Sequence, residues 1–118
     1  MSIAKVLVID DEQPILSMME DILELLEVEM DGVETGNEAL EKIKSGGYDL
    51  IICDLNLPDM DGKEFFVKAM EYEPGIKGKF VFSTGMNMDA DMKSYCEQHS
   101  IRFLGKPFRI EDIQKLIQ

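Results

Sequence analysis

The sequence predicts an α/β fold: a doubly wound, five-stranded parallel sheet with five helices, in the flavodoxin-like strand order 2-1-3-4-5. Three observations support it. Five short apolar runs alternate with five segments of helical periodicity, the 118 residues suit one domain, and 45% hydrophobic content suffices to cover both faces of a sheet. Right-handed crossovers between parallel strands then leave few topologies. We expect one domain over residues 1–118.

The predicted strands are short runs of β-branched and other apolar residues. In chain order they lie at residues 5–9, 28–32, 48–53, 79–83 and 102–104. The run at 48–53 gives the strongest signal. The run at 28–32 gives the weakest, because no glycine marks its start.

The predicted helices have apolar residues three and four positions apart, between start and stop signals. In chain order they begin after Pro14, after Thr35, at residue 63, at about residue 89 and after Pro107. Pro14 suits the first turn of a helix, and Thr35 with Glu38 forms a capping box. Gly46-Gly47 ends the second helix and Pro74-Gly75 the third.

Composition excludes several classes of protein. The chain has 24 acidic and 12 basic residues, a net charge of −12 that repels phosphate backbones, so we expect no direct binding to nucleic acid. No apolar run approaches the ~20 residues of a membrane span, and no signal peptide is evident, so we expect a cytoplasmic location and no membrane. Cys53 and Cys96 lack metal-ligand spacing and are expected to be reduced.

Polar residues stand where the predicted strands end. They are Asp10-Asp11-Glu12 after the first strand, Asp54 after the third, Ser83-Thr84-Gly85 after the fourth and Gly105-Lys106-Pro107 after the fifth. In the order 2-1-3-4-5, the acidic residues meet at the switch point between the first and third strands. Carboxylates this close repel one another, and Mg²⁺ with oxygen ligands relieves the repulsion. Lys106 adds a positive charge and Thr84 a hydroxyl donor, which together suit a phosphoryl group.

These residues resemble the receiver domains of two-component response regulators, in particular the chemotaxis-regulator type, over essentially the whole chain. The resemblance rests on the acidic pair Asp10-Asp11, on Asp54 followed by "LNLPDMDG", on Thr84-Gly85 and on "KPF" at 106–108. It implies a phosphorelay protein that receives phosphate from a histidine kinase or histidine phosphotransfer domain. A downstream effector protein or fused output domain would respond to the surface around the fourth helix and fifth strand.

The resemblance also implies roles for individual residues. Asp54 would accept phosphate as an aspartyl phosphate, with Thr84 and Lys106 bonded to the phosphoryl oxygens. The ligands of Mg²⁺ would be Asp10, Asp11, Asp54 and the main-chain carbonyl of Asn56, with Asp11 binding directly and Asp10 through water. The Lys106-Pro107 bond would be cis. Such a domain is a signalling module rather than an enzyme, although it assists its own phosphorylation and dephosphorylation.

Several residues have two interpretations at this stage. Phe103 is either the aromatic switch that moves with Thr84 or an ordinary core residue. Ser83 rivals Thr84 as the hydroxyl donor, and Glu12 is interpreted as a solvated or helix-start acid rather than a metal ligand. Met86 either shields the phosphoryl group from water or admits water to it.

The first helix has an apolar face wider than packing on a sheet requires. Its rim, either Leu16 with Leu23 or Met18 with Leu25, is therefore a candidate docking surface for a helical phosphodonor.

Two other functions remain open, as does the extent of the protein. A small Mg²⁺-dependent phosphohydrolase with an aspartate nucleophile is the main alternative, although such enzymes favour Asp-x-Asp after the first strand, where this chain has Asp10-Asp11-Glu12. A binding module that has lost phosphorylation is less favoured, because the acidic set and Lys106 are complete.

The chain ends at Gln118, within or just after its last helix, and is either a stand-alone receiver or a piece of a longer regulator or hybrid kinase.

Overall fold

The computed structural model describes residues 3–85 and 89–118, so the expectation for Met86 lies outside the described residues. In chain order the elements are β1 (Lys5–Ile9), α1 (Gln13–Leu25), β2 (Glu29–Val33), α2 (Gly36–Ser45), β3 (Leu50–Asp54), α3 (Gly62–Tyr72), the 3₁₀ helix η1 (Pro74–Lys79), β4 (Phe80–Thr84), α4 (Ala90–His99), β5 (Arg102–Gly105) and α5 (Ile110–Ile117). The strands pair in parallel in the order β2-β1-β3-β4-β5, which confirms the predicted fold.

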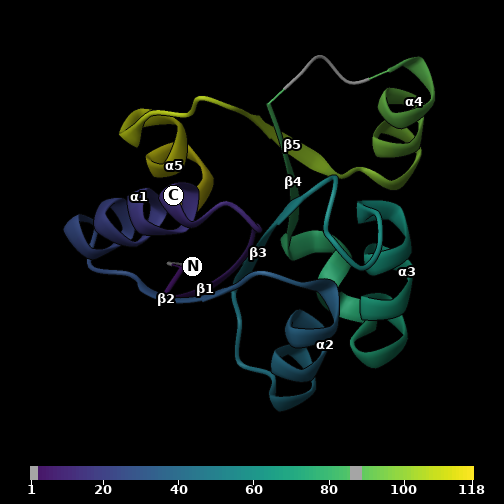
Figure 1. Ribbon diagram of the computed structural model, residues 1–118, viewed down its shortest axis with the longest axis horizontal. Coiled ribbons are helices and arrows are strands. Elements are labelled where there is room, and N and C mark those ends of the chain that lie inside the picture. The colour runs from purple at the N-terminus through teal and green to yellow at the C-terminus, as the bar shows by residue number, and fades with distance from the viewer. Residues whose placement is uncertain (1–2, 86–88) are drawn as a thin grey trace.

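Helices cover both faces of the sheet. Helices α1 and α5 lie on one side, and α2, α3 and α4 lie on the other (Figure 1). Because successive strand residues point to opposite faces, β1 contributes Val6 and Val8 to the core under α1 and α5. The same strand contributes Leu7 and Ile9 to the core under the other three helices. The alternation also fixes which residues at the strand ends share a face.

The element boundaries differ from the predicted ones by a few residues. Strand β4 begins at Phe80 rather than at residue 79, because Lys79 closes η1, a short helix that the sequence did not predict. The Lys79 ammonium donates to the Tyr48 carbonyl and to the Glu73 carboxylate. Strand β3 extends to Asp54, so the candidate phosphoacceptor is itself the last residue of a buried strand.

The predicted signals at the ends of α2 are present. The Thr35 hydroxyl accepts a hydrogen bond from the Glu38 N–H at 3.1 Å and donates to the Glu38 carboxylate at 3.0 Å. Gly46 and Gly47 have φ values of 74° and 89°, in the left-handed region that glycine adopts at low cost, and they end the helix. Residue types at turns therefore determine both ends of α2.

The packing of α1 corrects one expectation. Leu16 and Leu23 are buried, at 7% and 0% exposure, so they do not form an exposed rim. The Leu16 side chain lies over Gly32 of β2, where the absence of a side chain leaves room for it. Leu25 is 73% exposed, and Met18 on the same rim is half-buried. The exposed rim of α1 is therefore the one that contains Met18 and Leu25.

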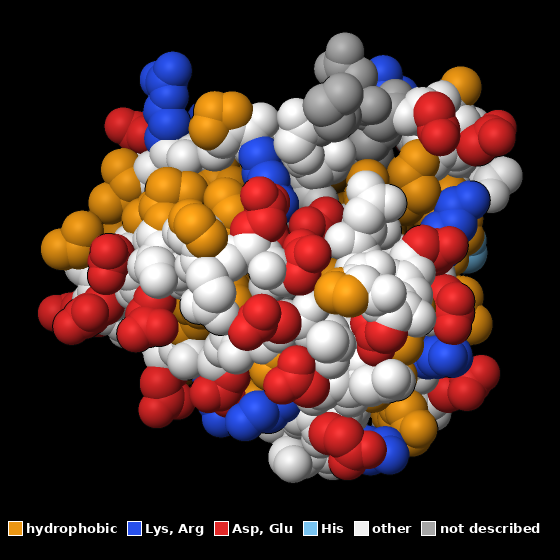
Figure 2. Space-filling model, in the orientation of Figure 1, with side chains coloured by type: hydrophobic (Ala, Val, Ile, Leu, Met, Phe, Trp, Pro, Cys, Tyr) orange, Lys and Arg blue, Asp and Glu red, His pale blue; other side chains and the backbone are white. Residues whose placement is uncertain are grey.

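Apolar side chains gather over α1 and α5 on the face shown in Figure 2. Those packed at the edge of this core are only partly buried: Ile15, Met18, Leu26, Ile110, Leu116 and Ile117. No helix among the described residues is long and apolar enough to cross a bilayer. Both cysteines are buried and free, which agrees with the expectation that they are reduced.

Candidate functional site

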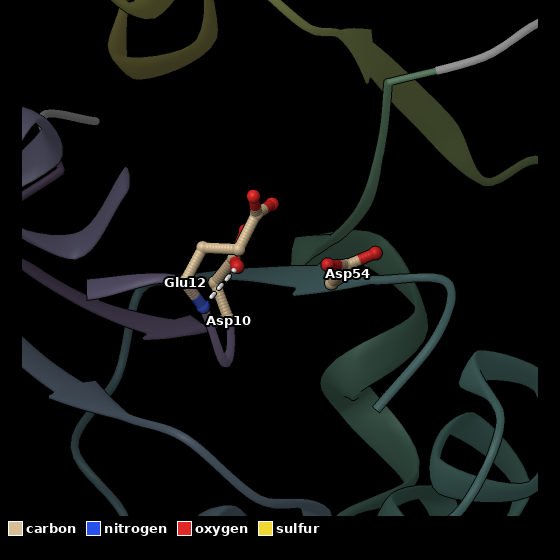
Figure 3. A group of neighbouring side chains, drawn as sticks. All are labelled: Asp10, Glu12 and Asp54. Carbon is tan, nitrogen blue, oxygen red and sulfur yellow. Dashed lines mark hydrogen bonds between the residues drawn. The ribbon is translucent and has the colours of Figure 1, made fainter. Parts of the chain in front are cut away.

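The candidate site lies at the carboxyl ends of the strands, where β1, β3 and β5 bring three charged residues together. Asp10 follows β1, Asp54 ends β3 and Lys106 follows β5. Figure 3 shows Asp10 and Glu12 beside the end of β1, with Asp54 at the end of the neighbouring strand. One carboxylate oxygen from each of Asp10, Glu12 and Asp54 lies within 4.8 Å of the other two. The parallel topology therefore concentrates negative charge at one edge of the sheet.

One ammonium group contacts all three carboxylates. The Lys106 Nζ lies 2.7 Å from Asp10 Oδ2, 3.3 Å from Asp54 Oδ2 and 3.4 Å from Glu12 Oε2. The Lys106 side chain is 10% exposed, so these bonds are partly shielded from water. One positive charge faces three negative ones, and a further cation at this position is electrostatically favoured.

The backbone fixes the orientation of the two buried carboxylates. Asp10 Oδ1 accepts a hydrogen bond from the Glu12 N–H at 2.9 Å, and Asp54 Oδ1 accepts one from the Asn56 N–H at 3.1 Å. Both are turns in which an Asp side chain bonds the backbone two residues ahead. In each case the other oxygen, Oδ2, remains directed toward Lys106.

Burial shifts the protonation equilibria of the site. Asp10 and Asp54 are 2% and 9% exposed. Burial raises the pKa of Asp54, and the nearby Asp10 adds to the rise, although the Asn56 N–H and Lys106 oppose it. Burial lowers the pKa of Lys106, but its bonds to Asp10 and Asp54 outweigh this and leave the pKa raised. An added cation would favour the ionised form of Asp54 that a nucleophile requires.

The third acid beside Lys106 is Glu12, whose position in the sequence favours a solvated side chain. Its carboxylate contacts Lys106, although the side chain is 61% exposed. Asp11 is exposed and lies outside this group of acids. The Glu12 N–H donates to Asp10 Oδ1 and closes a turn. This turn places Glu12, rather than Asp11, beside the Asp10 carboxylate. The sequence signal for such a turn is the Asp itself, whose side chain commonly bonds the backbone two residues ahead.

Asn56 lies in the loop between β3 and α3. It is exposed and forms an isolated bridge with Asp61, while the Leu57 N–H donates to the Met60 carbonyl at 3.2 Å. The loop is therefore a closed turn that begins directly at Asp54. Asp61 ends it by capping α3, where its carboxylate accepts from the Glu64 N–H.

Thr84 and Ser83 end β4 beside Asp54. The Thr84 carbonyl accepts a hydrogen bond from the Lys106 N–H at 2.7 Å, which joins the ends of β4 and β5, and the Lys106-Pro107 bond is cis as expected. Ser83 pairs with Asp54 in the sheet and is 3% exposed. Its hydroxyl has no hydrogen-bond partner within the described residues.

Phe103 of β5 is not a core residue. It is 55% exposed, whereas the next residue, Leu104, is buried under α1 and α5. Phe103 and Leu104 are successive residues of the edge strand β5, so their side chains point to opposite faces of the sheet. The expectation that Phe103 is an ordinary core phenylalanine is wrong, and its role as a switch stays a prediction.

A cleft of about 420 Å³ opens beyond the ends of β3 and β4. Its lining includes Asp54, Asn56 and Thr84, together with Lys63 of α3 and Asp91 of α4. The cleft gives molecules from solvent access to the candidate nucleophile. The site thus combines a reachable carboxylate, a neighbouring ammonium and oxygen donors for a cation.

Comparison with known proteins gives a consistent result. The family model described as the response regulator receiver domain matches residues 6–118. Hybrid signal transduction histidine kinase L of Dictyostelium discoideum is 30% identical over 98% of this chain, which spans 7% of that kinase. Chemotaxis protein CheY of Thermotoga maritima is 28% identical over 89% of this chain and 87% of its own length. The structure of Vibrio cholerae chemotaxis protein CheY4 matches with a TM-score of 0.84 and 28% identity, over 97% of this chain and 95% of that one.

Proposed function

The chain belongs to the family of response regulator receiver domains, and we propose that Asp54 carries its phosphoryl-accepting function. One observation carries the proposal: Asp54 lies at the end of β3 with Oδ2 only 3.3 Å from Lys106 Nζ, and it lines the open cleft. The family match does not favour the alternative of an aspartate-based phosphohydrolase. We further propose that the receiver domain spans residues 1–118 and acts in the cytoplasm.

Mg²⁺ is the proposed cofactor. The donor set fits this ion, because Mg²⁺ prefers oxygen ligands and carboxylates meet here beside the Lys106 ammonium. We propose the ligands Asp10, Asp11, Asp54 and the main-chain carbonyl of Asn56, with Glu12 beside them. The bound ion would neutralise charge on the phosphoryl oxygens and favour ionised Asp54.

The chemistry follows from the positions of the side chains. A carboxylate oxygen of Asp54 forms the new bond to phosphorus, and the bond from phosphorus to the donor breaks. Lys106 is placed to pair with the charge on the phosphoryl oxygens, and Thr84 supplies a hydroxyl donor at the end of β4. The product is a mixed anhydride that water hydrolyses. The domain is a signalling module, and this arrangement supports the proposal that it assists its own phosphorylation and dephosphorylation.

Incubation with acetyl phosphate and Mg²⁺ tests the function directly. We expect intact-protein mass spectrometry to show one added phosphoryl group per chain, and none when EDTA removes the metal. Absence of an adduct with Mg²⁺ present would contradict the proposal. Continued turnover of many phosphate monoesters would favour the phosphohydrolase instead.

The natural phosphodonor is proposed to be a histidine kinase or histidine phosphotransfer domain, and the recipient of the signal a downstream effector or fused output domain. Thr84 and Phe103 are the proposed switch, in which the exposed Phe103 ring moves inward as Thr84 shifts toward the phosphoryl group.

The rim of α1 that contains Met18 and Leu25 offers an apolar docking surface for a helical donor. This assignment replaces the rim with Leu16 and Leu23, which is buried.

Substitutions on the two rims of α1 separate docking from folding. We expect Met18→Ala to slow phosphotransfer about threefold to tenfold, from a histidine phosphotransfer domain that phosphorylates the unaltered chain, because the donor loses apolar contact area. Phosphorylation by acetyl phosphate should be unchanged. Leu16→Ala should lower the free energy of unfolding by about 2–4 kcal/mol, because it leaves a cavity in the core. Equal slowing of both phosphodonors by Met18→Ala would argue against docking at this rim.

A further inference from the structure

The loop between β3 and α3 is bonded to a helix distant in the sequence. The Asp59 carboxylate accepts hydrogen bonds from the Gly36 N–H on Oδ1 and from the Asn37 N–H on Oδ2, both at 2.9 Å. These are backbone groups in the first turn of α2, where amide hydrogens lack partners within the helix. The residues joined are 23 and 22 positions apart. Asp59 therefore caps a helix to which it does not belong.

The same helix end already has a local cap. Thr35 accepts from the Glu38 N–H, so Thr35 and Asp59 bond different amide groups of one helix terminus. The Asp59 bonds stabilise the end of α2, as the Thr35 bond does. Unlike Thr35, Asp59 also connects α2 to the loop between β3 and α3.

Packing reinforces the connection. Met60 is 7% exposed and lies against Gly36, where an added Cβ would come within 2.7 Å of the Met60 sulfur. Only glycine fits at this close approach unless Met60 moves. Burial raises the pKa of Asp59, but the hydrogen bonds from the Gly36 and Asn37 N–H groups outweigh it and leave the pKa lowered, which favours the ionised carboxylate at the helix end.

Hydrogen bonds continue from this anchor to the phosphoacceptor. The Leu57 N–H donates to the Met60 carbonyl, and the Gly62 N–H donates to the Leu55 carbonyl at 2.7 Å. At the start of the loop, the Asn56 N–H donates to Asp54 Oδ1. A loop closed by its own bonds moves as a unit, so its attachment to α2 also restrains Asn56.

We propose that Asp59 is a positioning residue, which fastens the loop to α2 and thereby holds the Asn56 carbonyl in place as a ligand for Mg²⁺. The inference rests on the proposed function, because that function makes Asn56 a metal ligand. Groups that orient metal ligands commonly affect affinity although they do not touch the metal. Coupling is reciprocal, so Mg²⁺ binding should also stabilise the junction between the loop and α2.

The test compares Asp59→Ala with Thr35→Ala, a variant that removes the local cap of the same helix and leaves the connection to the loop. The Kd for Mg²⁺ is measured by calorimetric titration at a temperature where both variants are folded, as judged by their thermal transitions. We expect Asp59→Ala to weaken Mg²⁺ binding about threefold to tenfold. Thr35→Ala should lower the transition temperature but leave the Kd unchanged.

Two further measurements complete the test. Glu38→Gln removes one negative charge at the same helix end without breaking the connection, so it should bind Mg²⁺ nearly as the unaltered chain does. A normal Kd in Asp59→Ala, or equal weakening in Thr35→Ala or Glu38→Gln, would overturn the inference. That result would leave the proposed function intact, whereas failure of the unaltered chain to bind Mg²⁺ would count against the proposed function itself.

Discussion

Asp54→Asn is expected to abolish the phosphoryl adduct formed with acetyl phosphate and Mg²⁺. The reason is chemical, because an amide oxygen lacks the negative charge with which a carboxylate attacks phosphorus. The substitution also preserves the size of the side chain and an oxygen that can accept from the Asn56 N–H. Mass spectrometry of the intact variant should therefore show no added phosphoryl group under conditions that modify the unaltered chain.

A control within the same cleft makes this result specific. Asp91 lines the cleft together with Asp54 but is exposed on α4. Asp91→Asn should retain the adduct. Loss of the adduct in Asp54→Asn cannot be attributed to unfolding if the thermal transition temperature of this variant is at least as high as that of the unaltered chain. We expect a transition at least as high, because the substitution removes one of three neighbouring negative charges. A persistent adduct in Asp54→Asn would assign the acceptor to another residue.

The fold and the centre of the candidate site were predictable because both depend on features repeated along the chain. Alternating apolar strands and amphipathic helices specify a parallel sheet, and parallel strands present their carboxyl ends at one edge. Asp10, Asp54 and Lys106 each stand at such an end. Their meeting is therefore a consequence of topology, and the structure places Lys106 within 3.3 Å of both buried acids.

The parts that sequence reasoning missed depend on single contacts between distant residues. Asp59 lies in the loop between β3 and α3, and its bonds to Gly36 and Asn37 depend on how that loop lies against α2. No periodicity encodes that relation. Glu12 is a local case, since the turn closed by Asp10 brings it to Lys106 although it is mostly exposed.

The rim of α1 illustrates a third kind of limit. Helical periodicity gives the angle between side chains around an axis, but not how far neighbouring elements extend over each rim. Leu16 is covered because Gly32 leaves space beside β2, while Leu25 near the other end of the helix has no such cover. A glycine in a strand is a sequence signal for such close approach, but the partner side chain becomes known only from the structure.

Lys106→Met is expected to destabilise the metal-free protein by about 3 kcal/mol. The variant keeps an apolar side chain of similar length but leaves Asp10 and Asp54 buried without their shared cation. The expected loss of unfolding free energy lies toward the lower end of the values for buried ion pairs that lose one partner. The reason is that the site is open to water beside Glu12 and through the cleft. Urea denaturation in EDTA measures it. Lys77→Met, at an exposed lysine, should change the free energy of unfolding by less than about 0.5 kcal/mol.

Repeating the measurement with Mg²⁺ separates the charge of Lys106 from its packing. If the loss arises from uncompensated carboxylates, a divalent cation among the same oxygens should restore much of the stability. The variant should then bind Mg²⁺ more tightly than the unaltered chain, because the ammonium no longer repels the ion. A loss that persists at saturating Mg²⁺ would mean that the lysine acts through its aliphatic contacts. Phosphorylation should remain slow in either case, since the metal cannot replace the ammonium that pairs with the phosphoryl oxygens.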